Sequence, residues 1–119
     1  MIELLPETKG NLIALKMSGT VTEDDEDRCV EKAEIILEKE RLEHLLLDWE
    51  HLDGWAKGAR TVGTWFAMHH RALVERIAIL ADEKWADEVL RITDIFKAAT
   101  VRQFAPSERA AAFAWIRQG

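Results

Sequence analysis

The sequence predicts an α/β domain with a mixed, mainly parallel sheet of about five strands and four helices packed on it. Short apolar runs alternate along the chain with stretches whose apolar residues recur at helical spacing. The first two runs are separated only by a turn-like segment, so they form an antiparallel hairpin. The predicted element order is ββαβαβαβα, and residues 1–119 form a single domain.

The first half of the chain holds the hairpin, one helix and a buried strand. Residues 2–5 and 11–18 are strands, and "PETKGN" between them has the Pro, Gly and Asn of a turn. Thr22 is a suitable N-cap, since the acidic residues after it suit the positive end of a helix dipole. The apolar stripe of this helix comprises Cys29, Val30, Ala33, Ile36 and Leu37. Residues 44–49, "HLLLDW", form a strand covered on both faces.

The second half continues the alternation. A second helix precedes "RIAILAD", residues 76–82, which is another buried strand. A third helix follows, because apolar residues recur at helical spacing at Trp85, Val89, Ile92 and Phe96. "ATVRQF" forms an edge strand, and Ser107 caps the final helix, whose inner side carries Phe113 and Ile116.

Composition restricts the partners and the location. The net charge of −6 argues against nucleic acid as a partner, because that binding depends on Lys and Arg contacting phosphates. The single cysteine, Cys29, is expected to be a small core residue in a reducing compartment. Neither a signal peptide nor a run of ~20 apolar residues is visible. We therefore expect a cytoplasmic, soluble protein, with at most peripheral contact with the inner face of the membrane.

Four segments carry a family resemblance. They are "GTVTEDD" after the second strand, "LLLDWEHLDGW" across the third, "RIAILADEKW" at the fourth, and "VRQF" with "SERAAAFAWI" at the end. Together they resemble the SpoIIAA-like family over nearly the whole chain. The resemblance implies a STAS-type fold, related in shape to anti-sigma-factor antagonists and to CRAL-TRIO lipid-transfer domains. It also implies a cavity beside the sheet, lipophilic ligands and membrane association, without a general enzymatic activity.

One departure from the wider STAS pattern concerns phosphorylation. The antagonists carry a phosphorylatable Ser after an Asp, where the third strand meets the second helix. Here Asp48 is followed by Trp49, and no Ser occurs in that region. A phosphorylation switch would have to use Thr61 or Thr64.

The loops after the parallel strands are the first candidate site, because ligands of open parallel sheets bind beyond the carboxyl ends of the strands. The loops expected to converge there are 18–22, 49–56, 81–85 and 104–107. Their large apolar residues are Trp49, Leu52, Trp55 and Trp85. These line the mouth of an apolar pocket or face a membrane interface. Alternatively, Trp49 and Trp85 are core residues, and Trp55 only packs against the helix start.

The second helix supplies further candidates. A projection at 100° per residue places one apolar face at Val62, Phe66, His69 and Leu73. Trp65 and His70 lie at its margins. His69 is then either a satisfied core histidine or a polar group that orients a ligand head.

Small and basic residues add two open questions about this helix. Ala59, Gly63 and Ala67 form a strip that either permits close packing or, together with Gly58, makes a flexible lid. Lys57 and Arg60 precede a long stretch without acidic residues. They either receive a phosphate or carboxylate at the helix start or lie on a solvated face.

Metal binding and catalysis have little support. The atoms of His51, Asp53, His69 and His70 suit a metal, but their spacing matches no common ligand motif, so we expect no metal and no cofactor. Asp48 and Asp53 could act as an acid–base pair only if both turned inward. No Ser or Cys nucleophile with a base is recognisable, so we expect a protein that is not an enzyme.

The sequence therefore favours a binding module that holds a lipophilic or amphiphilic small molecule beside the second helix, with peripheral membrane contact. The predicted ligand-binding residues are Trp49, Leu52, Trp55, Lys57, Arg60, Trp65, Phe66, His69 and Trp85. The alternative is a protein-interaction module resembling the anti-sigma antagonists but lacking their Ser, and an enzyme of unrecognised type is a third. A homodimer is compatible with each.

Overall fold

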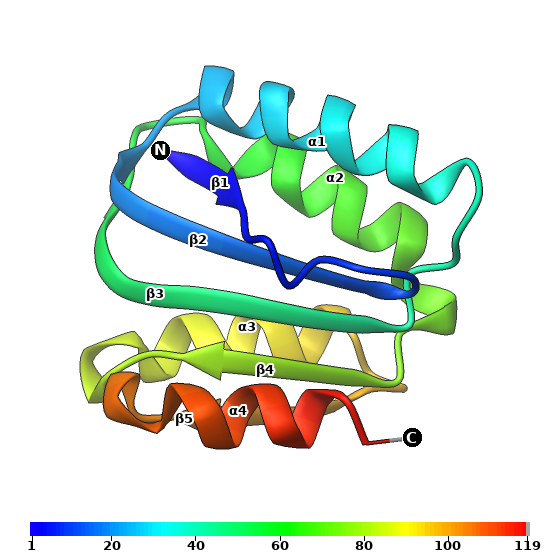
Figure 1. Cartoon of the computed structure of the whole chain (residues 1–119). Helices are drawn as coiled ribbons and strands as arrows, with labels where there is room; N and C mark the ends of the chain where they lie inside the picture. Colours follow the sequence, from blue (N-terminus) through cyan, green and yellow to red (C-terminus); the bar gives the residue numbers. More distant parts are fainter. Residues whose placement is uncertain (119) are drawn as a thin grey trace.

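The structure, a computed structural model, describes residues 1–118, without the side chain of Val62. The described part forms one five-stranded sheet, four α-helices and three short 3-10 helices (Figure 1). The strands are β1 (Ile2–Leu4), β2 (Leu12–Val21), β3 (His44–Trp55), β4 (Arg76–Leu80) and β5 (Thr100–Phe104). The α-helices are α1 (Glu23–Leu37), α2 (Arg60–His70), α3 (Ala86–Ile95) and α4 (Arg109–Ile116). The 3-10 helices are η1 (Arg71–Leu73), η2 (Glu83–Trp85) and η3 (Pro106–Glu108).

The strands follow one another across the sheet in the order β1-β2-β3-β4-β5. β1 pairs antiparallel with β2, with Ile2 opposite Met17, and every other neighbouring pair is parallel. The predicted element order, the initial hairpin and the edge position of β5 are confirmed. Consecutive residues Leu45, Leu46 and Leu47 are all buried, as expected for a strand covered on both faces.

β2 and β3 continue well beyond β4 and β5 and turn two of the expected loops into strand. The segments 18–22 and 49–56 were predicted as loops, and this is wrong for nearly all of both, because Ser18 still pairs with His51 and Val21 with Trp55. Two register shifts between the strands accommodate the extension. The polar residues that suggested a loop, Glu50, His51 and Asp53, occupy exposed positions of β3, whereas Leu52 between them is buried.

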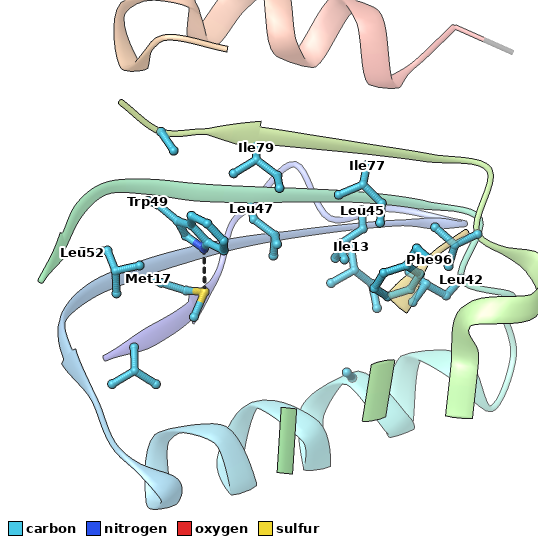
Figure 2. Packing of buried hydrophobic residues seen from close by; sticks show 14 residues of the cluster. Ile13, Met17, Leu42, Leu45, Leu47, Trp49, Leu52, Ile77, Ile79 and Phe96 are labelled. Carbon is cyan, nitrogen blue, oxygen red and sulfur yellow. Dashed lines mark hydrogen bonds between the residues drawn. The ribbon is translucent and has the colours of Figure 1, made fainter. Parts of the chain in front are cut away.

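The two faces of the sheet are covered unequally. α1, α2 and α3 lie over one face, and α4 packs on the other (Figure 1). Figure 2 shows side chains of the larger core, among them Leu47, Ile77 and Ile79, extending from the sheet away from α4 and toward α1. On the opposite face, Phe113 and Ile116 of α4 pack in a second cluster of buried apolar residues. The predicted inner side of this helix is therefore confirmed.

Hydrogen bonds at the helix starts confirm one predicted cap and correct another. Thr22 caps α1: its Oγ1 accepts from the amide of Asp25 at 3.1 Å, and its own amide donates to the Asp25 carboxylate at 2.9 Å. This backbone hydrogen bond lowers the pKa of Asp25. The predicted cap by Ser107 is wrong, because η3 precedes α4 and the Glu108 carboxylate accepts from the amide of Ala105 at 2.8 Å instead.

Candidate functional site

An apolar cavity of about 140 Å³ lies between the sheet and the layer of α1, α2 and α3. Its sheet side is formed by residues that include Ile13, Leu15, Leu45, Leu47 and Trp49. The helices contribute Val30, Ala33, Phe66, Ala67, Ile92 and Ile95, among others. The cavity thus adjoins the second helix, as the proposed ligand site did. It lies over the face of the sheet, however, and not beyond the strand ends.

One acidic side chain, Glu26 of α1, forms part of the cavity wall. It is only 5% exposed. Its Oε2 accepts a hydrogen bond from the amide of Gly63 at 2.6 Å, and its Oε1 has no hydrogen-bond partner. Burial raises the pKa of Glu26 to about 7, although the hydrogen bond from Gly63 and the positive charges of Arg91 and Arg60 oppose this. Glu26 is therefore a carboxyl group that titrates near neutral pH inside an apolar cavity.

The contact between Glu26 and Gly63 explains the small residue in α2. A Cβ atom built on Gly63 would overlap Glu26 Oε2. Gly63 lies in the first turns of a helix that has no side-chain N-cap, and Glu26 satisfies one of its free amides from the neighbouring helix. Close packing therefore accounts for Gly63. Gly58 has φ of +82°, so it is needed for the turn that precedes α2.

Three tryptophans pack against one another at one end of the cavity. The ring centroids of Trp49, Trp55 and Trp85 are 5.6–6.1 Å apart in edge-to-face arrangements. Trp49 is 2% exposed, and its Nε1 donates to the sulfur of Met17 at 3.0 Å (Figure 2). Trp49 is thus a core residue whose side chain also lines the cavity. Trp55 lines the cavity as well, whereas Trp85 packs against both rings outside the lining.

The predicted inner face of α2 is wrong, because the helix is rotated about its axis relative to the predicted orientation. His69 and Leu73 are exposed, and the side chain of Val62 lies outside the described part of the structure. Phe66 does face inward as predicted, together with Ala67 and His70, and His70 Nε2 donates to Glu34 Oε1 of α1 at 2.9 Å. Small residues face α1 because the two helices approach closely at Gly63. His69 is therefore not available to orient a ligand in the cavity.

The other predicted ligand-binding residues have mixed outcomes. Arg60 and Phe66 line the cavity, and Leu52 is 1% exposed in the core without lining it. Lys57 and Trp65 are exposed, and the ring of Trp65 stacks on His69 with centroids 4.9 Å apart. Arg60 does not form an open anion site with Lys57. It pairs with Glu88 at 2.6 Å and lies over the ring of Trp55, 4.5 Å from its centroid.

The residues considered for metal binding or acid–base chemistry do not come together. His51 and Asp53 are exposed on β3. Asp48 is buried but faces α4, where its Oδ2 accepts from Arg109 at 2.6 Å. Within residues 1–118, no three His, Cys, Asp or Glu side chains are arranged to hold a metal ion. In the same range no helix is long and apolar enough to cross a bilayer.

Two further cavity residues bear on the sequence predictions. Burial raises the pKa of Cys29 to about 11, so its thiol stays protonated at neutral pH. Thr64, one of the two candidates for a phosphorylation switch, accepts a hydrogen bond from Arg91, whereas Thr61 is exposed.

Glu26 was missed because it belongs to the acidic run "EDDED", which suits a solvated helix start. The signal was nonetheless present. Cys29, Val30 and Ala33 follow Glu26 at three, four and seven residues, so the apolar stripe of α1 extends onto it. An acidic residue at a stripe position indicates a buried carboxyl group.

The fold and the cavity together define a class of protein: a small STAS-like α/β domain with an apolar cavity between its sheet and three covering helices. The chain belongs to the SpoIIAA-like family, whose sequence profile matches residues 12–117.

The solved structures that are similar to this one include the following two. One is an uncharacterised DUF3478-family protein with a SpoIIAA-like fold from Shewanella loihica PV-4, at a TM-score of 0.78 and 20% identity, covering 97% of this chain and 93% of that one. The other is the Bacillus cell fate determinant SpoIIAA in its phosphorylated form, at a TM-score of 0.63 and 10% identity, covering 95% and 99%. At these identities the likeness shows the fold alone. No curated protein sequence matches the chain.

Proposed function

We propose that this protein is a non-enzymatic module that binds a small lipophilic or amphiphilic molecule in the cavity between the sheet and α1, α2 and α3. The observation that carries the proposal is the cavity itself, about 140 Å³ in volume and walled mainly by apolar side chains. Native cores are packed with few voids larger than a water molecule, so a cavity of this size needs an explanation. A ligand that contributes apolar surface supplies one.

The arrangement of the walls suits an amphiphile. The polar side chains, Glu26, Arg60, Thr64 and Arg91, belong to the helices that cover the cavity. The sheet side is apolar. A bound molecule would place its hydrocarbon part on the sheet and its polar group under the helices.

Native mass spectrometry of gently purified protein, followed by organic extraction, tests the proposal. A small adduct that survives desalting and is recovered in the extract supports a ligand-binding role and identifies its class. A bare mass that stays unchanged after incubation with lipid extract and with toluene contradicts it. That outcome would favour a protein-docking module instead.

A cavity-filling variant makes the test specific to this site. Ala67→Leu adds three carbons at the cavity wall, and we expect it to abolish adduct formation while the protein stays folded. Ala110→Leu is the matched control, because Ala110 is exposed on α4 on the opposite face of the sheet. If both variants retain the adduct, the ligand occupies another part of the molecule.

We also propose peripheral membrane contact through the outer face of α2 and η1. The Trp49–Trp55–Trp85 cluster is packed inward, whereas Trp65 is 58% exposed, with Met68 and Leu73 each 51% exposed beyond it. Trp is favoured at membrane interfaces, and Arg71 on the same surface can contact anionic headgroups. Trp65→Ala should reduce co-sedimentation with vesicles containing anionic lipid. Equal co-sedimentation of the variant and the parent would exclude this face.

A further inference from the structure

One oxygen atom of Glu26 lies buried in the cavity wall without a hydrogen-bond partner. Oε2 is occupied by the amide of Gly63, and Oε1 has no partner among the residues that the structure describes. The large majority of buried side-chain polar atoms in native proteins have a hydrogen-bond partner. A ligand whose polar group hydrogen-bonds Oε1 would remove this deficit.

Charged and titratable groups on three helices lie around this carboxyl group. Arg60 of α2 and Arg91 of α3 line the same cavity, while Asp27 and the Cys29 thiol lie close on α1 itself. Arg60 is paired with Glu88, and Arg91 donates to the hydroxyl of Thr64. A ligand ammonium group would be attracted by Glu26 but repelled by Arg60 and Arg91, and a carboxylate or phosphate would meet the opposite combination, so neither charge gains a clear net attraction. Either charged group would also lose its hydration in this apolar cavity, which a neutral group does at much lower cost. The cavity therefore favours a neutral polar group.

A hydroxyl group fits both protonation states of Glu26. It donates to an ionised carboxylate and accepts from a protonated carboxyl group. Because the pKa of Glu26 is about 7, both states are populated at neutral pH. An ether or ketone could pair only with the protonated form, so a hydroxyl is the most suitable neutral group.

The volume limits the size of the molecule. An engineered 150 Å³ apolar cavity in another protein binds benzene, and the cavity here is about 140 Å³. A ligand of about six to ten non-hydrogen atoms therefore fits, whereas a diacyl lipid does not.

We infer that the cavity binds a small neutral alcohol, with its hydroxyl on Glu26 Oε1 and its hydrocarbon part against the apolar floor formed by Leu15, Leu47 and Trp49. This inference rests on the proposed ligand-binding function and specifies the class of ligand. It makes Glu26 the residue that determines specificity.

Calorimetric titration at pH 7 with toluene, benzyl alcohol, benzylamine and benzoate tests the inference. We expect benzyl alcohol to bind the parent protein at least about tenfold more tightly than benzylamine or benzoate. Glu26→Met removes both carboxyl oxygens, so the ratio of benzyl alcohol affinity to toluene affinity should fall about tenfold or more. Glu26→Gln keeps hydrogen-bonding atoms at the same place and should hold that ratio within about threefold.

The carbon-13 chemical shift of the Glu26 side-chain carboxyl in the parent gives a readout that needs no variant. It should move on addition of benzyl alcohol and stay constant on addition of toluene. The inference is overturned if the parent binds toluene as tightly as benzyl alcohol, or if the carboxyl chemical shift does not change when benzyl alcohol is added. In either case the proposed function stands. Failure of both toluene and benzyl alcohol to bind the parent overturns the proposed function as well.

Discussion

Replacing Glu26 by glutamine should make the protein more stable at alkaline pH. The pKa of Glu26 is about 7 in the folded protein, against 4.5 for an unperturbed glutamate. Between these values the folded state binds more protons than the unfolded state, so this group lowers the stability as pH rises through that window. Each tenfold shift in the ionisation equilibrium corresponds to ~1.4 kcal/mol, so the ionised carboxylate destabilises the folded protein by up to about 3 kcal/mol above pH 7.

Glutamine removes this dependence while it keeps an oxygen that accepts from the Gly63 amide. We expect Glu26→Gln to unfold with a free energy about 2–3 kcal/mol greater than the parent at pH 8, with little difference near pH 4.5. Urea unfolding followed by tryptophan fluorescence at pH 4.5 and pH 8 measures the change. Glu31→Gln is the matched control, because Glu31 is exposed on the same helix and should show little pH-dependent difference.

The refuting result is a Glu26→Gln variant that is no more stable than the parent at pH 8. Arg60, Arg91 and the Gly63 amide would then compensate the buried charge fully, and burial would not control the titration of Glu26.

Three further substitutions test individual contacts by urea unfolding. Gly63→Ala should destabilise the protein by about 1–3 kcal/mol because the new methyl group overlaps Glu26. In a Glu26→Ala background the same substitution should stabilise the protein by about 1 kcal/mol, because alanine has the higher helix propensity. Destabilisation in both backgrounds would mean that the overlap with Glu26 is not the cause. Arg109→Ala should cost about 2 kcal/mol by leaving the buried carboxylate of Asp48 without its cation, and a loss below about 0.5 kcal/mol would show that Asp48 is solvated. Thr22→Ala should cost about 1 kcal/mol through loss of the α1 cap, and an unchanged stability would argue against that cap in solution.

The order and type of the elements were predictable because buried strands and amphipathic helices have different periods. The ends of β2 and β3 were not predictable. The two strands stay paired beyond Ser18 and His51, with shifts in register, although the β3 segment "EHLDG" is polar enough to suggest a loop. Sequence alone shows the polarity of such a segment but not the strand beside it.

The face of α2 was misplaced for a different reason. A hydrophobic projection gives most weight to large apolar residues, yet Trp65 is exposed and Gly63 is the point of contact with α1. Where two helices pack closely, the inner positions carry small residues, so the most hydrophobic face of the helix is not the face that is buried. Trp49, Trp55, Arg60 and Phe66, four of the predicted ligand-binding residues, line the cavity, and the predictions of the two tryptophans did not depend on this angle.

The order of strands across the sheet has a consequence for how the chain folds during synthesis. Each strand lies beside the strand that precedes it in the sequence, and paired residues such as Leu15 with Leu47, or Leu47 with Ile79, are only about 30 positions apart. When a strand leaves the ribosome, the strand it pairs with has therefore already been translated. No later strand has to insert between two strands that are already in the sheet. Since domains begin to fold from the N-terminal side during translation, this sheet can grow one strand at a time and limit the exposure of its unpaired edge.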